Sequence, residues 1–476
     1  MATQQETAST TAGNAFGWRF VTPMFMGSAL NPVNSSLIAT ALVPIAAAMG
    51  VSIGRTAVLV SALYLASSIA QPTAGKLAEE FGPRRVFLAG ILLVLAGGLV
   101  GGFGANLTAL IIARVLIGVG TSAGYPSAML LIRRRAASAG LGAPPGSVLG
   151  GLVIAGMVTP AVGLPIGGAL VEAWGWRTTF FVNVPIALIT LVMAWIWIPR
   201  DPAADPDAST AASRSFSDVA KRLDAAGIVA FGGTMAALLV FLMSLPRPNW
   251  IALAIAVVAA GALAWWELRA DRPFFDIRLL GRNRALSRTY LRWAILGLCV
   301  YTVLYGVTQW LQAGRGLSAL AAGLVLLPMS AAGAIIARPV SQRNLLRMPL
   351  LIAGVSCLAG SAGVLLLTSS TPLALIVLVT LLFGVTLGTG ASANQTALYA
   401  QVDGAQIGTA SGLFRTFGYI GSIASSAIIS IVFHASVSDH GLHVIAVVMT
   451  VVSAVALVLT VADRRLMALK KAGSGG

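Results

Sequence analysis

The chain contains fourteen apolar stretches that are each long enough to cross a lipid bilayer as a helix. The hydrocarbon core of a bilayer is about 30 Å thick, so an α-helix needs roughly 20 apolar residues to span it. The stretches lie near residues 18–45, 56–77, 86–104, 107–132, 146–171, 178–198, 225–245, 249–267, 289–313, 317–337, 349–368, 372–399, 406–434 and 441–462. Strands of a membrane barrel would be about 10 residues long and would alternate polar and apolar residues. The sequence therefore predicts an all-α integral membrane protein with fourteen transmembrane helices.

The basic residues are concentrated in every second loop. When both termini are placed on one side of the membrane, that side carries 25 of the 31 lysines and arginines. The loops on the other side carry only Arg55, Arg177, Arg247 and Arg315. Cytoplasmic loops are enriched in Lys and Arg, so we expect both termini to be cytoplasmic. The net charge of +16 thus reflects membrane topology, and the lipid bilayer, with no nucleic acid, is the expected macromolecular partner.

Polar interruptions divide the chain into parts. We predict an N-terminal cytoplasmic tail (1–18), a six-helix bundle (19–198), a flexible cytoplasmic linker rich in Pro, Ala, Ser and Asp (199–224) and an inserted helical hairpin (225–267). A basic cytoplasmic linker (268–288), a second six-helix bundle (289–462) and a cytoplasmic tail (463–476) complete the chain. A six-plus-six arrangement is common in transporters with internal repeats.

Several motifs make the chain recognisable. The turn after the second stretch contains Gly75, Glu79, Gly82, Arg84 and Arg85, which resemble the loop signature of the major facilitator superfamily. An acid and basic residues at a glycine turn can pair across helix ends, so we expect this group to act as a conformational latch. Four further segments narrow the resemblance to the fourteen-span drug:proton antiporters of that superfamily. Three are in the first half: the RxxxG element 114–118, the fifth-span antiporter signature with Gly163, Pro165, Gly167 and Gly168, and the WGWR and FxxNxP residues of 174–185. The fourth is in the second half and comprises 309–312, Gly316, Gly323 and Leu327-Pro328.

The resemblance implies two six-helix bundles around a central cavity that opens alternately to the two sides. It also implies a monomer in the bacterial cytoplasmic (inner) membrane that exports small organic or drug-like compounds, with protons as the expected coupling ion. It implies no cofactor and no metal. Candidate residues on helices that line the cavity in such a fold are Asn31, Asn34, Arg114, Gln309, Gln312, Asn394, Gln395 and Arg415.

One departure from the family pattern concerns charge. The first stretch reads Leu30-Asn31-Pro32-Val33-Asn34 where the family normally has an aspartate, and all fifteen acids fall in predicted loops or at helix ends. Proton relays within membranes usually use Asp, Glu or His. Two arginines, Arg114 and Arg415, do lie within predicted helices, where a cation is costly and is normally paired or functional. We therefore expect a net positive cavity that favours neutral or anionic amphiphiles.

Two other functions remain open on the sequence. The missing carboxylates favour a uniporter or importer without proton antiport. A membrane-embedded transferase would need a nucleophile, base or metal constellation, and we find no His/Cys/Asp cluster with ligand spacing and no phosphate-binding GxxxxGK[ST] motif. We therefore predict a transporter and not an enzyme.

Overall fold

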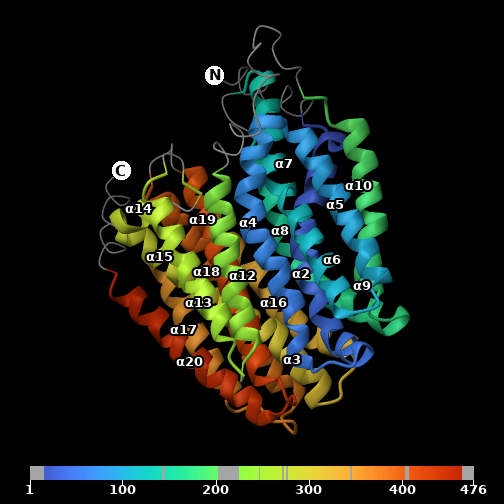
Figure 1. Ribbon diagram of the computed structural model, residues 1–476, viewed down its shortest axis with the longest axis vertical. Helices are drawn as coiled ribbons and strands as arrows, with labels where there is room; N and C mark the ends of the chain where they lie inside the picture. Colours follow the sequence, from blue (N-terminus) through green and yellow to red (C-terminus); the bar gives the residue numbers. More distant parts are fainter. Residues whose placement is uncertain are drawn as a thin grey trace.

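The computed structural model describes residues 16–141, 145–201, 224–245, 247–270, 273–274, 277–342, 346–402 and 407–463, and the regular structure of these residues is entirely helical. The tail 1–18 lies mostly outside the described residues. The linker 199–224 and the tail 463–476 lie almost entirely outside them. The helices run roughly parallel to the long axis of the molecule (Figure 1).

The first six transmembrane segments form the N-terminal bundle. Its helices are α2 (Trp18–Met49), α3 (Ile53–Thr56), α4 (Val58–Phe81), α5 (Pro83–Phe103), α6 (Leu107–Ser122), α7 (Gly124–Ser138), α8 (Gly146–Trp174), α9 (Thr178–Phe181) and α10 (Asn183–Trp197). The short helices continue their neighbours, so that α6 and α7 form one span, as do α9 and α10. Prolines 23, 32 and 44 lie inside α2, which is tolerated in membrane helices because neighbouring groups re-satisfy the freed carbonyls.

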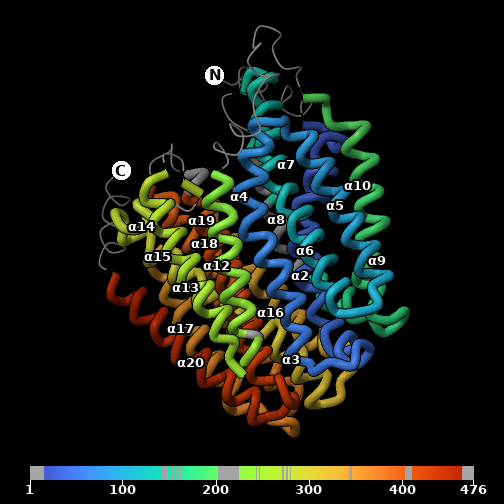
Figure 2. Tube along the Cα trace, viewed as in Figure 1, coloured from blue at the N-terminus to red at the C-terminus, as the bar shows by residue number. Residues whose placement is uncertain are grey.

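The remaining helices form an inserted hairpin and the C-terminal bundle. The hairpin consists of α12 (Ala225–Met243) and α13 (Trp250–Glu267), and α12 packs against both α4 and α19. The C-terminal bundle follows the short helix α14 (Ile277–Arg282). Its helices are α15 (Arg284–Thr302), the π-helical turns η1 (Val303–Val307) and η2 (Trp310–Gly314), α16 (Ala319–Gln342), α17 (Arg347–Val364), α18 (Leu373–Tyr399), α19 (Ile407–Val432) and α20 (Asp439–Val461). Figure 2 traces the chain through these three parts.

The predicted fold class is confirmed. Thirteen helical segments among the described residues are long and apolar enough to cross a membrane, and α8, with 29 residues, is the fourteenth. One prediction was wrong in detail: the ninth span begins at Arg284 instead of near residue 289. Arg292, which was counted among the loop charges although it falls within the predicted stretch 289–313, lies inside α15 and is 1% exposed.

Successive spans are antiparallel, so the described chain starts and ends at the same end of the bundle. We call the end at which α2 begins and α20 finishes the terminal end. The end with the turns after Met49, Phe103, Trp174, Gly314 and Val432 is the far end. In Figure 1 the terminal end is at the top, where the N- and C-termini are marked.

Candidate functional site

A cavity of about 350 Å³ lies between the two bundles. Its walls come from α2, α4, α6 and α7 on one side and from α15, η1, α16, α18 and α19 on the other, with Leu152 of α8. The lining residues include Trp293, Gln395 and Phe414, all in the half of their membrane spans nearest the terminal end. The cavity thus reaches from the middle of the bundle towards the terminal end.

Contacts between the bundles are concentrated at the far end. The backbone N–H of Gly54 donates to the carbonyl of Phe433 at 3.2 Å, and the hydroxyls of Ser61 and Ser426 are hydrogen bonded. Deeper in the bundle, the hydroxyl of Tyr305 donates to the carbonyl of Ser35 at 3.0 Å and lies 3.1 Å from the hydroxyl of Tyr64. These pairs each join one bundle to the other, so the far end is closed.

The fifth-span signature lies at this closed interface, where α8 packs between α2 and α16. A Cβ at Gly167 would lie 2.9 Å from the carbonyl oxygen of Leu37 in α2, and one at Gly168 would lie 2.6 Å from the Cα of Leu320 in α16. A Cβ at Gly163 would likewise meet the side chain of Ser36. The glycines let three backbones approach within contact distance, which is the usual role of small residues in membrane helix packing. Pro165 is half-buried on the same helix.

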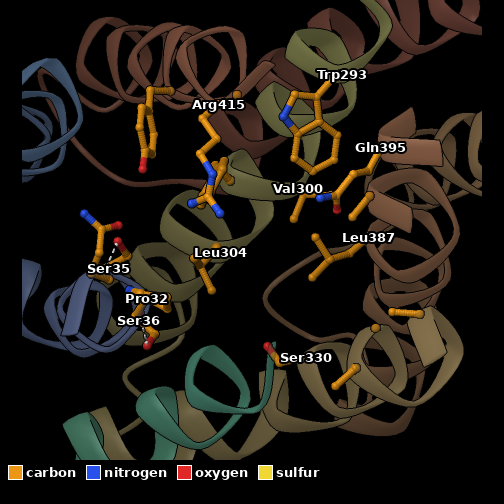
Figure 3. A pocket seen from close by; sticks show the side chains of 18 of the residues that line it. Pro32, Ser35, Ser36, Trp293, Val300, Leu304, Ser330, Leu387, Gln395 and Arg415 are labelled. Atoms are coloured by element: carbon orange, nitrogen blue, oxygen red, sulfur yellow. Dashed lines mark hydrogen bonds between the residues drawn. The ribbon is translucent and has the colours of Figure 1, made fainter. Parts of the chain in front are cut away.

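Three of the eight predicted cavity residues line the cavity: Asn31, Gln395 and Arg415. Figure 3 shows Gln395 and Arg415 in the cavity wall. The amide of Asn31 donates to Ser67 Oγ at 3.1 Å and to Thr121 Oγ1 at 2.9 Å, which holds it in place. The amide of Gln395 donates to the hydroxyl of Tyr399 at 2.9 Å. Among the lining residues, Arg415 is the one charged side chain, and no carboxylate accompanies it.

The other predicted cavity residues lie behind the wall. Arg114 is 1% exposed and donates from Nε to the carbonyl of Leu59 at 3.0 Å and from Nη1 to that of Asn34 at 3.1 Å. The side chain of Asn34 donates to Asn183 Oδ1 at 2.7 Å. Arg114 therefore ties α6 to α4 and α2, and Asn34 ties α2 to α10.

The second-half amides are also buried. Asn394 Oδ1 accepts from Arg292 Nε at 2.7 Å, a pairing that the sequence did not indicate because Arg292 was assigned to a loop. Gln309 is fully buried, and within the described structure neither of its amide atoms has a hydrogen-bond partner. Gln312 is 8% exposed. These residues do not appear among the side chains that line the cavity.

The glycine turn is organised around an acid that the sequence pattern did not single out. Asp201, just after α10, accepts from the backbone N–H of Arg84 at 3.3 Å and of Arg85 at 3.1 Å, at the start of α5. It also lies 3.6 Å from Arg134 of α7. Gly82 has a φ of +98°, and a Cβ there would meet the Asp201 side chain. Glu79 is exposed, and Gly75 has room for a Cβ. In this conformation the turn ties α5, α7 and α10 within the N-terminal bundle.

We expect Asp201→Ala to lower the thermal unfolding midpoint of the purified protein. The variant leaves two N–H groups at the start of α5 without an acceptor, and losing a cap of this kind costs about 1–2 kcal/mol. Glu79→Ala is the matched control and should change stability by less than about 0.5 kcal/mol, as exposed substitutions usually do. A larger loss for Glu79→Ala than for Asp201→Ala would contradict this assignment.

The described residues contain no group of three or more His, Cys, Asp or Glu that could hold a metal ion. The site consists instead of a largely apolar cavity with amide, hydroxyl and guanidinium groups at fixed places. Such a cavity can bind an organic molecule and orient it by a few polar contacts.

Comparison with known proteins places this geometry in a family. Residues 24–426 match the family described as Major Facilitator Superfamily. The uncharacterized MFS-type transporter YwoD of Bacillus subtilis strain 168 is 31% identical over 466 residues, which cover 96% of this chain and 98% of YwoD. The tetracenomycin C resistance and export protein of Streptomyces glaucescens is 27% identical over 435 residues, or 89% of this chain and 77% of that protein.

A solved structure of similar fold is that of the peptide transporter POT in complex with sulfate. The two chains superpose with a TM-score of 0.63 at 14% identity, and the match covers 96% of each chain. At this identity the likeness concerns the fold alone.

Proposed function

Since the chain belongs to the major facilitator superfamily and is an integral membrane transporter, we propose that it exports small organic, drug-like compounds from the cytoplasm by alternating access. The observation that carries the proposal is the cavity between the bundles, which extends towards the terminal end and is closed at the far end by Gly54–Phe433, Ser61–Ser426 and Tyr64–Tyr305. The Streptomyces relative is named as a resistance and export protein, which supports transport out of the cytoplasm.

We place the terminal end on the cytoplasmic side of the bacterial inner membrane. The support is the excess of Lys and Arg in the loops of that end. In this orientation the described conformation faces inward and can take up substrate from the cytoplasm or the inner leaflet. The chain would act as a monomer, because each copy contains both bundles.

The proposed energy source is the proton gradient, as in the fourteen-span antiporters that the sequence resembles. Among the described residues no carboxylate lines the cavity, so the proton must be carried elsewhere. His443 lies near the far end on α20, with Nε2 2.7 Å from the carbonyl of Leu367. His443, Glu79 and Glu172 are the first residues to substitute in a search for the proton carrier.

The lack of a carboxylate in the described cavity lining favours a second candidate, a uniporter or importer that moves neutral or anionic solutes without proton exchange. The two candidates differ in whether an imposed pH gradient drives substrate movement. Both use the cavity described above.

The test is transport by purified protein in liposomes that contain a pH-sensitive dye. Neutral, anionic and cationic amphiphiles are added with and without an imposed pH gradient, and protein-free liposomes are the control. We expect proton movement on addition of substrate and gradient-driven substrate accumulation. Substrate flux that ignores the gradient would contradict proton antiport and favour the uniporter. A complete lack of flux for all three classes would contradict the export of amphiphiles.

A further inference from the structure

Arg415 differs from the other described residues that line the cavity by its charge. It is half-buried on α19 and is the one charged residue in the described lining. Figure 3 shows its guanidinium extending into the space between Ser35 of α2 and Leu304 of η1. This is where a molecule in the cavity would lie.

The guanidinium has aromatic neighbours and no carboxylate partner in the described structure. Its central carbon lies 4.2 Å from the ring centroid of Tyr125, in α7 of the other bundle. Tyr419, one turn along α19, donates a hydrogen bond to Gln71 Oε1 in α4. Arg415 and Tyr419 thus both reach across the cavity to the N-terminal bundle.

An arginine without a carboxylate partner has a different solvation energy in the open and in the closed form of the cavity. While the cavity is open at the terminal end, water can solvate the guanidinium. When the bundles close over the cavity, that water is lost, and a charge in a low-dielectric space is costly unless it is paired. An anionic group on the bound molecule would supply the pairing, and guanidinium–oxyanion hydrogen bonds are among the strongest in proteins.

The other described residues of the cavity wall suit a ligand with a flat apolar ring system. Trp293 and Phe414 both line it and are stacked, with ring centroids 5.0 Å apart and an interplanar angle of 14°. Val300, Leu304 and Leu387 add an aliphatic wall. A volume of about 350 Å³ is at the lower end of typical ligand pockets, which suits a compact molecule of a few rings.

We propose that Arg415 is the specificity-determining residue of the cavity and binds the single anionic group of a compact aromatic amphiphile. The inference rests on the proposed function and narrows its substrate class from neutral or anionic compounds to anions. The bound oxyanion competes with the Tyr125 ring for the guanidinium. Binding therefore releases one of the links between the bundles on the cavity side, which allows them to move relative to each other.

A matched pair of fluorescent probes tests the charge requirement directly. 8-Anilinonaphthalene-1-sulfonate is anionic, and N-phenyl-1-naphthylamine has the same ring system without the sulfonate. Binding is measured on the full-length protein in nanodiscs, with the signal of protein-free nanodiscs subtracted. We expect the wild type to bind the sulfonate at least about fivefold more tightly, because only the sulfonate can pair with Arg415. A wild type that prefers the neutral probe would overturn the proposal.

Variants separate charge recognition from structural damage. Arg415→Gln should weaken sulfonate binding by about tenfold or more, the loss of one charge-assisted contact, and should change binding of the neutral probe by less than about twofold. Arg415→Lys should retain a preference for the sulfonate. Arg347→Gln, which removes an exposed arginine at the start of α17, is the control of equal charge change and should behave as wild type. Equal losses for both probes in Arg415→Gln, or no loss for either, would overturn the proposal.

The binding assay also distinguishes this inference from the proposed function. If the neutral probe is transported by the wild type while Arg415→Gln leaves the sulfonate preference intact, export stands and the assignment of Arg415 is wrong. If both probes bind as expected but neither crosses the membrane in liposomes, the recognition site stands and the export proposal is wrong.

Discussion

Replacing Gly168 with valine is expected to reduce transport by more than about tenfold, by preventing the far end from closing. A Cβ at this position would lie 2.6 Å from the Cα of Leu320, and a backbone atom cannot move aside as a flexible side chain can. Overpacking of this kind typically costs about 1–3 kcal/mol. Because the clash exists only where α8 and α16 are in contact, the cost falls on the described conformation and shifts the population by about 5- to 150-fold towards the far-open form. A transporter must visit both forms in each cycle, so turnover falls.

Transport in liposomes and far-side labelling check this prediction together. A cysteine introduced at Ser426, which is 1% exposed in the closed interface, should react slowly with a membrane-impermeant maleimide from the far side. Gly168→Val should raise that rate. Gly261→Val is the matched control, because Gly261 lies on the hairpin and a Cβ added there would have no atom within 4 Å. If Gly168→Val transports at the wild-type rate, α8 and α16 do not separate and rejoin during the cycle.

Replacing Arg114 with leucine is expected to reduce transport to less than about a tenth of the wild-type rate, while the protein still folds. Its hydrogen bonds to the carbonyls of Leu59 and Asn34 are charge-assisted and contribute about 1.5–3 kcal/mol each. The leucine also removes the desolvation cost of the buried guanidinium, which offsets part of this loss. What the variant loses is the hydrogen bond that holds α2 in place at the carbonyl of Asn34. The next carbonyl of α2, that of Ser35, accepts from Tyr305 of the other bundle.

Arg114→Lys distinguishes this geometric role from a requirement for charge alone. The guanidinium reaches two carbonyls from a planar fork, whereas an ammonium is a single point donor, so we expect the lysine variant to transport poorly as well. Arg55→Gln, an exposed arginine in the same bundle, is the control and should transport normally. Full activity in Arg114→Lys would mean that the positive charge, and not the double hydrogen bond, is what the cycle needs. The measurement is initial transport rate at equal reconstituted amounts of protein.

The transmembrane layout could be predicted from the sequence to within a few residues. For thirteen of the fourteen spans the observed helices start within about three residues of the predicted apolar stretches, since hydropathy is a property of consecutive residues and needs no partner. The exception, the ninth span, shows the limit of that method. Arg284 and Arg288 made its first turn look like a loop. Arg292 follows inside the helix, and its hydrogen bond to the distant Asn394 explains how an arginine can be buried there.

The candidate site could be predicted only in part. Asn31, Gln395 and Arg415 lie in the cavity wall, whereas Arg114, Asn34, Gln309, Gln312 and Asn394 lie outside it. All eight are polar residues on helices that the resemblance assigned to the cavity. The difference between the two groups is the rotation of each helix about its axis. A helix such as α18, in which polar residues do not gather on one face, does not reveal that rotation through its pattern.

The sequence by itself determined that this protein is a fourteen-span membrane transporter with an excess of positive charge at one end. Those properties follow from local hydropathy, from charges in loops and from motifs of adjacent residues. The tertiary structure decided which arginine lines the cavity and which is buried between helices, and it identified Asp201 as the acid of the glycine turn. Each of these depends on partners far apart in the chain, such as Arg415 with Tyr125 and Arg84 with Asp201. Hydrogen bonds and ring contacts form only after the helices have packed, so no stretch of sequence contains them.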